Sequence, residues 1–275
     1  MDGRVAVVTN VSIDHVDYLG PTRDQIAAEK AGIIKPGTAL VLGETDDDVA
    51  ALFLDRGAAS VVRRGVDFGV RGGTLAHGGR VVDLYTPGAQ YPGVFLPLHG
   101  AHQGDNAAVA LAAAEAFIGR PLDPGVVAEA FASVSSPGRL EVVGRSPLVL
   151  LDGAHNVAGA EALRAALDEE FAPRPLTLVV GLLREKDPRE MLTALGAGDA
   201  TLIICCRPPS PRALDPERIA SAAADLGVPE DRIEVVDSVA DGIAAAMLGT
   251  MDDGQIVVAG SLYAVGAARS FLVKH

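Results

Sequence analysis

The chain has 275 residues, of which 49% are hydrophobic and 21% are charged, a composition that excludes a disordered or low-complexity polypeptide. Its length suits two ordinary domains or one large α/β domain. The 23 Lys and Arg residues against 36 Asp and Glu residues give a net charge of −13, which makes the chain a poor general binder of nucleic acid. We therefore expect a globular protein without a nucleic-acid partner, although a local basic site for a small anion is compatible with this charge.

The first half of the chain combines short strands with helices. A β-branched run at 4–11 is typical of a buried parallel strand, and Thr22 is the expected cap of a helix over 22–34. Between 65 and 97 glycine is frequent and the apolar runs are short, which indicates antiparallel hairpins. The other predicted elements are strands at 38–42 and 60–64 and helices at 46–55, 105–117 and 124–134.

The second half alternates apolar strands with helices. Asp215 and Pro216 are a typical N-cap and first helical residue. The alternation predicts a doubly wound, mostly parallel sheet that binds ligands beyond the carboxyl ends of its strands. The predicted strands are 148–151, 176–183, 201–206, 232–236 and 255–259, and the predicted helices are 156–171, 187–195, 215–226, 239–248 and 263–272.

A linker is expected at 135–139, where Pro137 and Gly138 interrupt the chain just before the regular alternation begins. We therefore predict two domains, residues 1–137 and residues 138–275.

The apolar stretches, the first residues and the two cysteines all bear on the compartment of the protein. The apolar stretches are far shorter than the roughly 20 residues of a membrane-spanning helix, and the first residues lack the pattern of a secretion signal. Cys205 and Cys206 are adjacent on a predicted strand, so they point to opposite faces and cannot form an ordinary disulfide. We expect core thiols rather than catalytic or metal-binding ones, in a cytoplasmic protein that binds no membrane.

Two charged positions near the start have competing interpretations. His15 stands between Asp14 and Asp17 after the first strand, where it can bind a metal or phosphate or be a loop histidine held by neighbouring carboxylates. Lys30 lies within a predicted helix, and a lone helical lysine is usually a solvated charge. The residues alone do not decide between these readings.

Two further clusters follow. Asp105 or Asn106 is a candidate cap of the next helix, whose N-terminus is also suited to an anion. Arg139 at the linker can clamp phosphoryl oxygens with its planar guanidinium. Asp152 ends the first strand of the second half, where it can orient a metal-bound water or merely cap the helix from Asn156. No phosphate-binding glycine loop of the common types, no nucleophile elbow and no metalloprotease motif occurs in the sequence.

Taken together, the clusters resemble the folylpolyglutamate synthase/dihydrofolate synthase family of Mur-type ATP-dependent amide ligases. The resemblance spans the whole chain, and its motifs follow one another in family order. The matching segments are Thr9-Asn-Val-Ser-Ile-Asp-His-Val-Asp-Tyr-Leu-Gly20, Glu29-Lys-Ala-Gly-Ile-Ile-Lys35, His102-Gln103 with Asn106-Ala107, Ser136-Pro-Gly-Arg139, Asp152-Gly-Ala-His-Asn156, Lys186-Asp187 and Gly260-Ser-Leu-Tyr263.

The resemblance implies a reaction in which ATP phosphorylates the carboxylate of a folate or dihydropteroate and the amine of L-glutamate displaces the phosphate. It implies ATP and Mg²⁺ as cofactors. His15 matches a magnesium-binding histidine, and Lys30 matches a lysine whose carbamylated side chain offers oxygen to the ion. Both are expected to be catalytic as well as metal-binding.

The resemblance also implies a nucleotide site. Asn106, Arg139 and Asp152 match ATP-binding residues, and Arg139 is also expected to act in catalysis by neutralising charge during phosphoryl transfer. His155 and Tyr263 lie in family motifs and are expected near the nucleotide, as cofactor-binding residues, or at the closing interface.

The expected fold is the remainder of a Mur-ligase-type central ATPase domain followed by a Rossmann-like C-terminal domain. The family's phosphate loop is missing, so we interpret the chain as an N-terminally truncated ligase that is inactive alone and monomeric. The alternatives are a peptidoglycan or cyanophycin-type amide ligase, or a nucleotide-binding module without catalysis.

Overall fold

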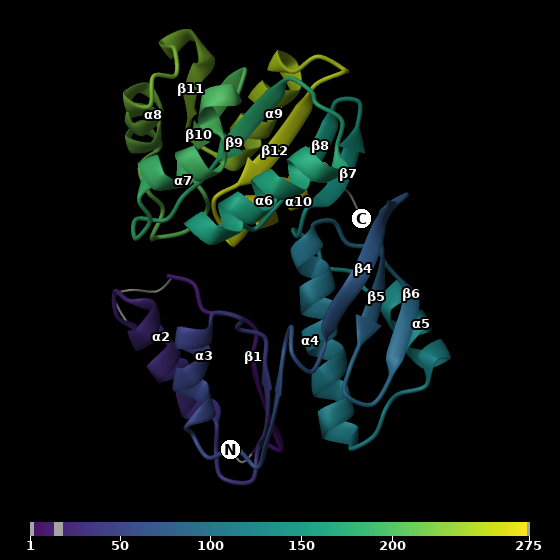
Figure 1. Cartoon of the computed structure of the whole chain (residues 1–275). Helices are drawn as coiled ribbons and strands as arrows, with labels where there is room; N and C mark the ends of the chain where they lie inside the picture. Colours follow the sequence, from purple (N-terminus) through teal and green to yellow (C-terminus); the bar gives the residue numbers. More distant parts are fainter. Residues whose placement is uncertain (1–2, 14–18, 274–275) are drawn as a thin grey trace. The chain divides into compact units, whose positions relative to one another are not determined.

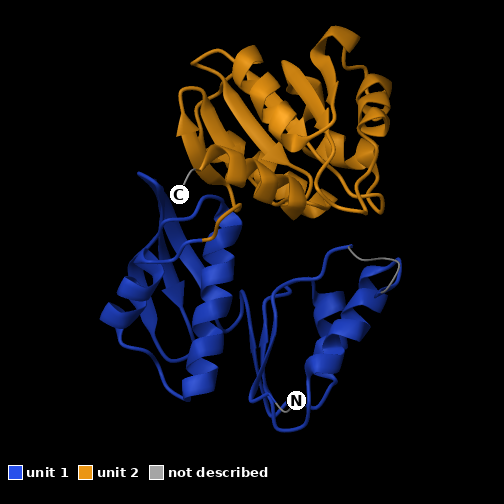
Figure 2. Cartoon of the chain, turned by 180° about the vertical axis from the view of Figure 1, so that it is seen from behind, with its two compact units in different colours: residues 1–135 blue, residues 136–275 orange. Residues whose placement is uncertain are grey.

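The computed structural model describes residues 3–13 and 19–273 and divides into two compact units, residues 1–135 and 136–275 (Figure 2). His15 therefore lies outside the described residues. None of the helices in the described ranges is both long and apolar enough to cross a membrane.

The first unit contains a parallel sheet in the order β1-β2-β3 (Figure 1). Side chains alternate between its two faces, as they do in any strand: Leu40 and Leu42 pack with the helices that follow β1 and β2, whereas Val41 packs in a second core. The first strand is shorter than predicted and ends at Val8, before the polar residues Thr9 and Asn10. The elements are β1 (Val5–Val8), α2 (Arg23–Lys30), a 3₁₀ turn (Ala31–Ile33), β2 (Ala39–Leu42), α3 (Asp47–Leu54) and β3 (Ser60–Arg63).

An antiparallel sheet and two helices complete this unit. The predicted hairpins are confirmed, because β5 pairs antiparallel with both β4 and β6. The sheet shares its core with α4 and with Val41 of the parallel sheet. The elements are β4 (Gly69–Ala76), β5 (Gly79–Tyr85), β6 (Gln90–Leu96), α4 (Ala101–Ile118) and α5 (Pro124–Ala132).

The start of α4 differs from the prediction. Gly100 is the N-cap, with φ of +95°, so the helix begins at Ala101 without a side-chain cap. Asp105 and Asn106 therefore lie inside the helix and do not cap it. Because Gly adopts positive φ without steric cost, the chain turns into the helix earlier than the polar residues suggest.

The second unit is built on a sheet in the order β11-β10-β9-β12-β8-β7. Its pairs are parallel except β7 with β8, which confirms a mostly parallel, doubly wound fold. The antiparallel strand β7 was not predicted, because it is short, half-buried and directly follows the linker. The strands are β7 (Glu141–Arg145), β8 (Leu148–Leu151), β9 (Leu176–Val180), β10 (Leu202–Cys206), β11 (Ile233–Val236) and β12 (Gln255–Ala259).

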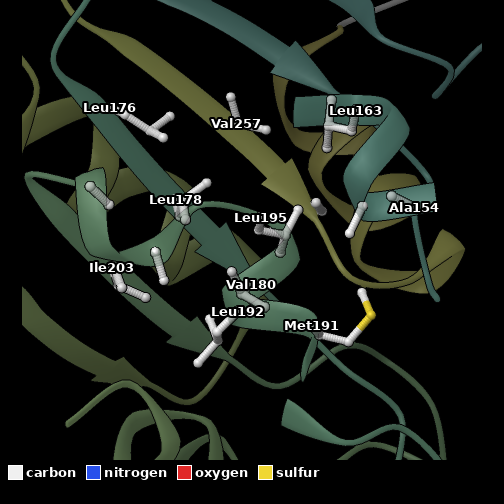
Figure 3. Packing of buried hydrophobic residues seen from close by; sticks show 14 of the residues in the cluster. Ala154, Leu163, Leu176, Leu178, Val180, Met191, Leu192, Leu195, Ile203 and Val257 are labelled. Atoms are coloured by element: carbon white, nitrogen blue, oxygen red, sulfur yellow. The ribbon is translucent and has the colours of Figure 1, made fainter. Parts of the chain in front are cut away.

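Helices cover both faces of this sheet, and two apolar clusters result (Figure 1). Figure 3 shows one cluster, in which Leu178 and Ile203 of the strands lie near Leu192 and Leu195 of the α7 region. As predicted, Asp215 caps α8 and Pro216 is its first residue. The helices are α6 (Val157–Glu170), α7 (Pro188–Ala194), α8 (Pro216–Asp225), α9 (Val239–Gly249) and α10 (Leu262–Leu272), with 3₁₀ turns at Ala197–Asp199 and Glu230–Arg232.

The adjacent cysteines lie on opposite faces of β10. Cys205 belongs to one apolar cluster and Cys206 to the other, and both thiols are free and fully buried. Burial raises the pKa of each thiol to about 12. The prediction of packing residues is confirmed.

Candidate functional site

The carboxyl end of β8 is the centre of the candidate site in the second unit. Asp152 follows the strand, and its buried carboxylate accepts hydrogen bonds from the backbone N–H of Leu140 at 2.7 Å and of Ala154 at 2.8 Å. The expected alternative that Asp152 caps α6 is wrong, because Asn156 is the cap and accepts from the N–H of Gly159 at 2.8 Å. Asp152 instead joins the turn before β7 to the loop after β8.

Arg139 lies in that turn and reaches the loop after β8. The N–H of Gly153 donates to the carbonyl of Gly138 at 2.7 Å, so the two backbone segments are in contact. A Cβ atom placed on Gly153 would lie 2.9 Å from Nη1 of Arg139 and 2.5 Å from Cδ2 of Leu262. The guanidinium therefore occupies space that any residue other than glycine would fill.

The loops after β9 and β12 adjoin this site. The N–H of Gly260 donates to the carbonyl of Ala154 at 2.9 Å, and the hydroxyl of Ser261 donates to the carbonyl of Gly181 at 2.8 Å. Ser261 is also the N-cap of α10, because its oxygen accepts from the N–H of Ala264 at 3.1 Å. Three strand ends therefore converge on one edge of the sheet.

His155 lies on the loop after β8, and Tyr263 lies at the start of α10. Nδ1 of His155 is 2.8 Å from the carbonyl oxygen of Gly153. Tyr263 is in the first turn of α10, with 44% of its surface exposed. The structure thus places Arg139, Asp152, His155 and Tyr263 on the same edge of the second unit.

This edge has the features of an anion site. Two helices, α6 and α10, begin there, and the N-terminus of a helix attracts negative charge. Arg139 adds a guanidinium, which suits phosphate oxygens in particular. Gly153 and Gly260 let neighbouring groups approach the backbone closely, since a Cβ atom on either would lie within 3.0 Å of another atom. These residues fit a nucleotide phosphate.

In the first unit, Lys30 reaches the carboxyl end of β1. Nζ of this half-buried residue donates to the carbonyl of Asn10 at 3.1 Å. Across the described ranges, no group of three His, Cys, Asp or Glu side chains gathers as a metal site. An ammonium group does not bind a cation, so Lys30 fits a metal site only in its carbamylated form.

A charged network around the buried Glu44, in the same unit as Lys30, escaped prediction from the sequence. The carboxylate of Glu44 accepts hydrogen bonds from the N–H groups of Val11, Thr45 and Asp46 at 2.8, 2.9 and 2.9 Å. Arg23 lies 3.3 Å from Glu44 and 2.8 Å from Asp46, and its Nε donates to the carbonyl of Val11 at 3.1 Å. Glu44 and Arg23 thus hold the segment that continues toward His15.

Electrostatics support this network. The pKa of the Asp46 carboxyl is lowered, first by the N–H of Val49 and then by the hydrogen bond from Arg23. Asp46 is also the N-cap of α3. For Glu44, the available sequence signal was an acidic residue just after a strand. Its partners Arg23 and Val11, however, are 21 and 33 residues away in the sequence.

Asn106 lies in the same unit as Lys30. Its Nδ2 donates to Oε1 of the buried residue Gln103 at 3.1 Å, within α4. The neighbouring Asp105 pairs with Arg64 at 2.7 Å, and Nε of Arg64 donates to the carbonyl of Gly43 at 2.8 Å. The first turns of α4 are therefore tied to the carboxyl ends of β2 and β3.

Comparison with known proteins identifies both units. Residues 1–114 match the Mur ligase middle domain, and residues 138–262 match the Mur ligase, glutamate ligase domain. The fold and the site thus define a protein of the Mur ligase class. Within that class, the chain belongs to the folylpolyglutamate synthase/dihydrofolate synthase family, as the motifs predicted.

Individual relatives and solved structures lead to the same family. The chain is 41% identical to the dihydrofolate synthase/folylpolyglutamate synthase of Mycobacterium tuberculosis, over 97% of the chain and 60% of that protein. A structure of M. tuberculosis folylpolyglutamate synthase with ADP and AMPPCP aligns with a TM-score of 0.91 and 39% identity, covering 99% of the chain and 64% of that protein. Escherichia coli FolC with DHPP and ADP aligns with a TM-score of 0.82 and 29% identity, covering 97% and 60%. The chain thus spans about 60% of the length of these relatives.

Proposed function

We propose that the chain is the nucleotide-binding and glutamate-ligase part of an enzyme that joins L-glutamate to dihydropteroate or to a folate with the consumption of ATP. The observation that carries the proposal is the guanidinium of Arg139 over Gly153, beside two helix N-termini. Relatives that share this fold were crystallised with ADP. Their folate chemistry favours this function over a peptidoglycan or cyanophycin-type ligase.

The chemistry requires an activated carboxylate, because a carboxylate ion resists attack by an amine. Transfer of the terminal phosphoryl group of ATP gives an acyl phosphate and ADP. The neutral amine nitrogen of glutamate then attacks the acyl carbon, an amide bond forms, phosphate leaves with the electron pair of the broken C–O bond, and the nitrogen loses a proton, which the phosphate can accept. The proposed role of Arg139 is to neutralise charge on the phosphates during the first step.

Further nucleotide contacts are proposed within each unit separately. His155 and Tyr263 are on the same edge of the second unit as Arg139, and Asp152 fixes the loop that carries His155. Asn106 is the proposed contact from the first unit. We also propose that the functional domains are residues 1–137 and 138–275, which the compact units 1–135 and 136–275 support.

Lys30 and His15 are the proposed ligands of Mg²⁺, with Lys30 carbamylated. The ammonium first loses one proton; the neutral amine nitrogen then bonds to the carbon of CO₂ and loses a second proton, which leaves a carbamate with carboxylate-like oxygen donors. Bound Mg²⁺ would neutralise phosphate charge. Incubation with ¹³C-bicarbonate should give a carbamate NMR signal that Lys30→Ala removes and that the exposed control Lys35→Ala leaves in place. A signal that survives in Lys30→Ala would contradict the assignment.

Partners and compartment follow from the same proposal. The partners are small molecules, namely ATP, glutamate and a folate or dihydropteroate. We further propose a monomer in the cytoplasm that binds neither nucleic acid nor membrane.

Nucleotide binding tests the proposal directly. Isothermal titration of the purified chain with ADP should show binding, and Arg139→Ala should weaken it by at least about tenfold, because a hydrogen bond to a charged group contributes about 1.5–3 kcal/mol. Arg145→Ala is the matched control, since Arg145 is an exposed arginine on β7 of the same unit. Equal affinities of the wild type and Arg139→Ala would refute the proposed role of Arg139.

A further inference from the structure

Glu141 lies two residues after Arg139 and holds the turn in which Arg139 sits. Its Oε2 accepts a hydrogen bond from the N–H of Gly138 at 2.9 Å. Both of its carboxylate oxygens lie 3.1 Å from Nε of Arg269, which is on α10. With 22% of the Glu141 side chain and 31% of the Arg269 side chain exposed, the pair is only partly screened by water.

The backbone of this turn needs such support. Gly138 has φ of +72°, and Leu140 has φ of +45°, a conformation that an L side chain rarely adopts. Strained conformations persist where surrounding contacts impose them. Here the contacts come from Glu141 on the N–H of Gly138 and from Asp152 on the N–H of Leu140. Arg139 lies between these two held positions, so its backbone is fixed from both flanks.

Helix α10 is part of the same arrangement. A Cβ atom on Gly138 would lie 2.7 Å from Cγ1 of Val265, so the turn packs directly on this helix. Arg269 is one turn further along α10, and Tyr263 is in its first turn. The ion pair between Glu141 and Arg269 therefore fastens the Arg139 turn to the helix that carries another candidate site residue.

We propose that Glu141, paired with Arg269, is a positioning residue that orients Arg139 for the nucleotide phosphates. This inference rests on the proposed function. In this proposal Glu141 acts through Arg139 and does not itself contact the nucleotide.

The test separates orientation from binding. The first readout is the Nε–Hε NMR resonance of Arg139 in the nucleotide-free chain, assigned by its loss in Arg139→Lys. In Glu141→Ala this resonance should move toward the position of freely rotating arginines. In Glu141→Gln, which keeps an acceptor for the N–H of Gly138, most of the wild-type position should return.

The second readout is ADP affinity by isothermal titration. Glu141→Ala should weaken ADP binding by about tenfold, as expected for losing a charge-assisted hydrogen bond, and Glu141→Gln should restore most of the loss. Asp168→Ala is the matched control, because it breaks the Arg164–Asp168 pair at 3.0 Å on α6 of the same unit. Arg269→Gln removes the ion pair while leaving Glu141 in place. If Glu141→Ala does not fold, the Arg139 resonance in Arg269→Gln tests the positioning role instead.

An unchanged Arg139 resonance in the Glu141 and Arg269 variants would overturn the positioning role. Equal losses of ADP affinity in Asp168→Ala and Glu141→Ala would also overturn it, because the effect would then be general destabilisation. If the wild-type chain binds no ADP, the proposed function fails, and the Arg139 resonance still decides whether Glu141 orients this side chain.

Discussion

Asp152→Ala should destabilise the second unit far more than a typical change at a sheet edge. The carboxylate is buried and accepts from two backbone N–H groups, those of Leu140 and Ala154. The substitution removes both acceptors. A hydrogen bond to a charged group contributes about 1.5–3 kcal/mol, so losing two should lower the free energy of unfolding by about 3–6 kcal/mol.

Thermal unfolding followed by circular dichroism measures this loss. A domain of this size loses roughly 3 °C in Tm per kcal/mol, so Asp152→Ala should lower the Tm by about 10 °C or more. Asp152→Asn keeps one acceptor oxygen and should show about half the effect. Asp168→Ala, which breaks an exposed pair worth at most about 1 kcal/mol, is the control.

The reasoning would be refuted by a Tm of Asp152→Ala equal to that of the Asp168 control. The two backbone N–H groups would then find other partners at no cost, and Asp152 would not be the clamp of the Arg139 turn.

The other predictions concern close packing and thiol reactivity. Gly43→Ala should destabilise the first unit by about 1–3 kcal/mol in urea unfolding, because its Cβ would lie 2.3 Å from a backbone oxygen that follows β1; an unchanged midpoint would contradict this packing. Gly153→Ala should displace the guanidinium of Arg139, whose Nη1 would lie 2.9 Å from the new Cβ, and so weaken ADP binding in calorimetry. Affinity equal to wild type would show that this contact is irrelevant to the nucleotide. Cys205 and Cys206 should resist iodoacetamide at pH 8 in the folded chain, since burial raises their pKa to about 12; mass spectrometry should find alkylation only after unfolding, and rapid labelling of the native chain would disprove their burial.

Local signals in the sequence predicted most of the second unit. A cap such as Asp215 before Pro216 acts within one helical turn, so the sequence alone locates the start of α8. The start of α4 was missed because it depends on the positive φ of Gly100 rather than on a polar cap. Strand β7 was missed because its pairing with β8 is what stabilises so short a segment.

The site residues, too, were predictable only where a local sequence signal marks them. The linker and the strand end predicted where Arg139 and Asp152 would lie, and the structure brings their two segments together. Glu44 was missed, because its role depends on Val11 and Arg23, which are distant in sequence. Lone charges of this kind carry no pattern until the fold supplies their partners.

The hydrogen bonds of the Arg139 turn have a mechanical consequence for the linker. Gly138 and Leu140 are hydrogen-bonded to Gly153 and Asp152, so the turn is held to the second unit on both sides of Arg139. Any bending of the chain between the units must then occur before Gly138. Arg139 is thus carried as a fixed part of the second unit, and its distance from Asp152 is independent of interdomain motion.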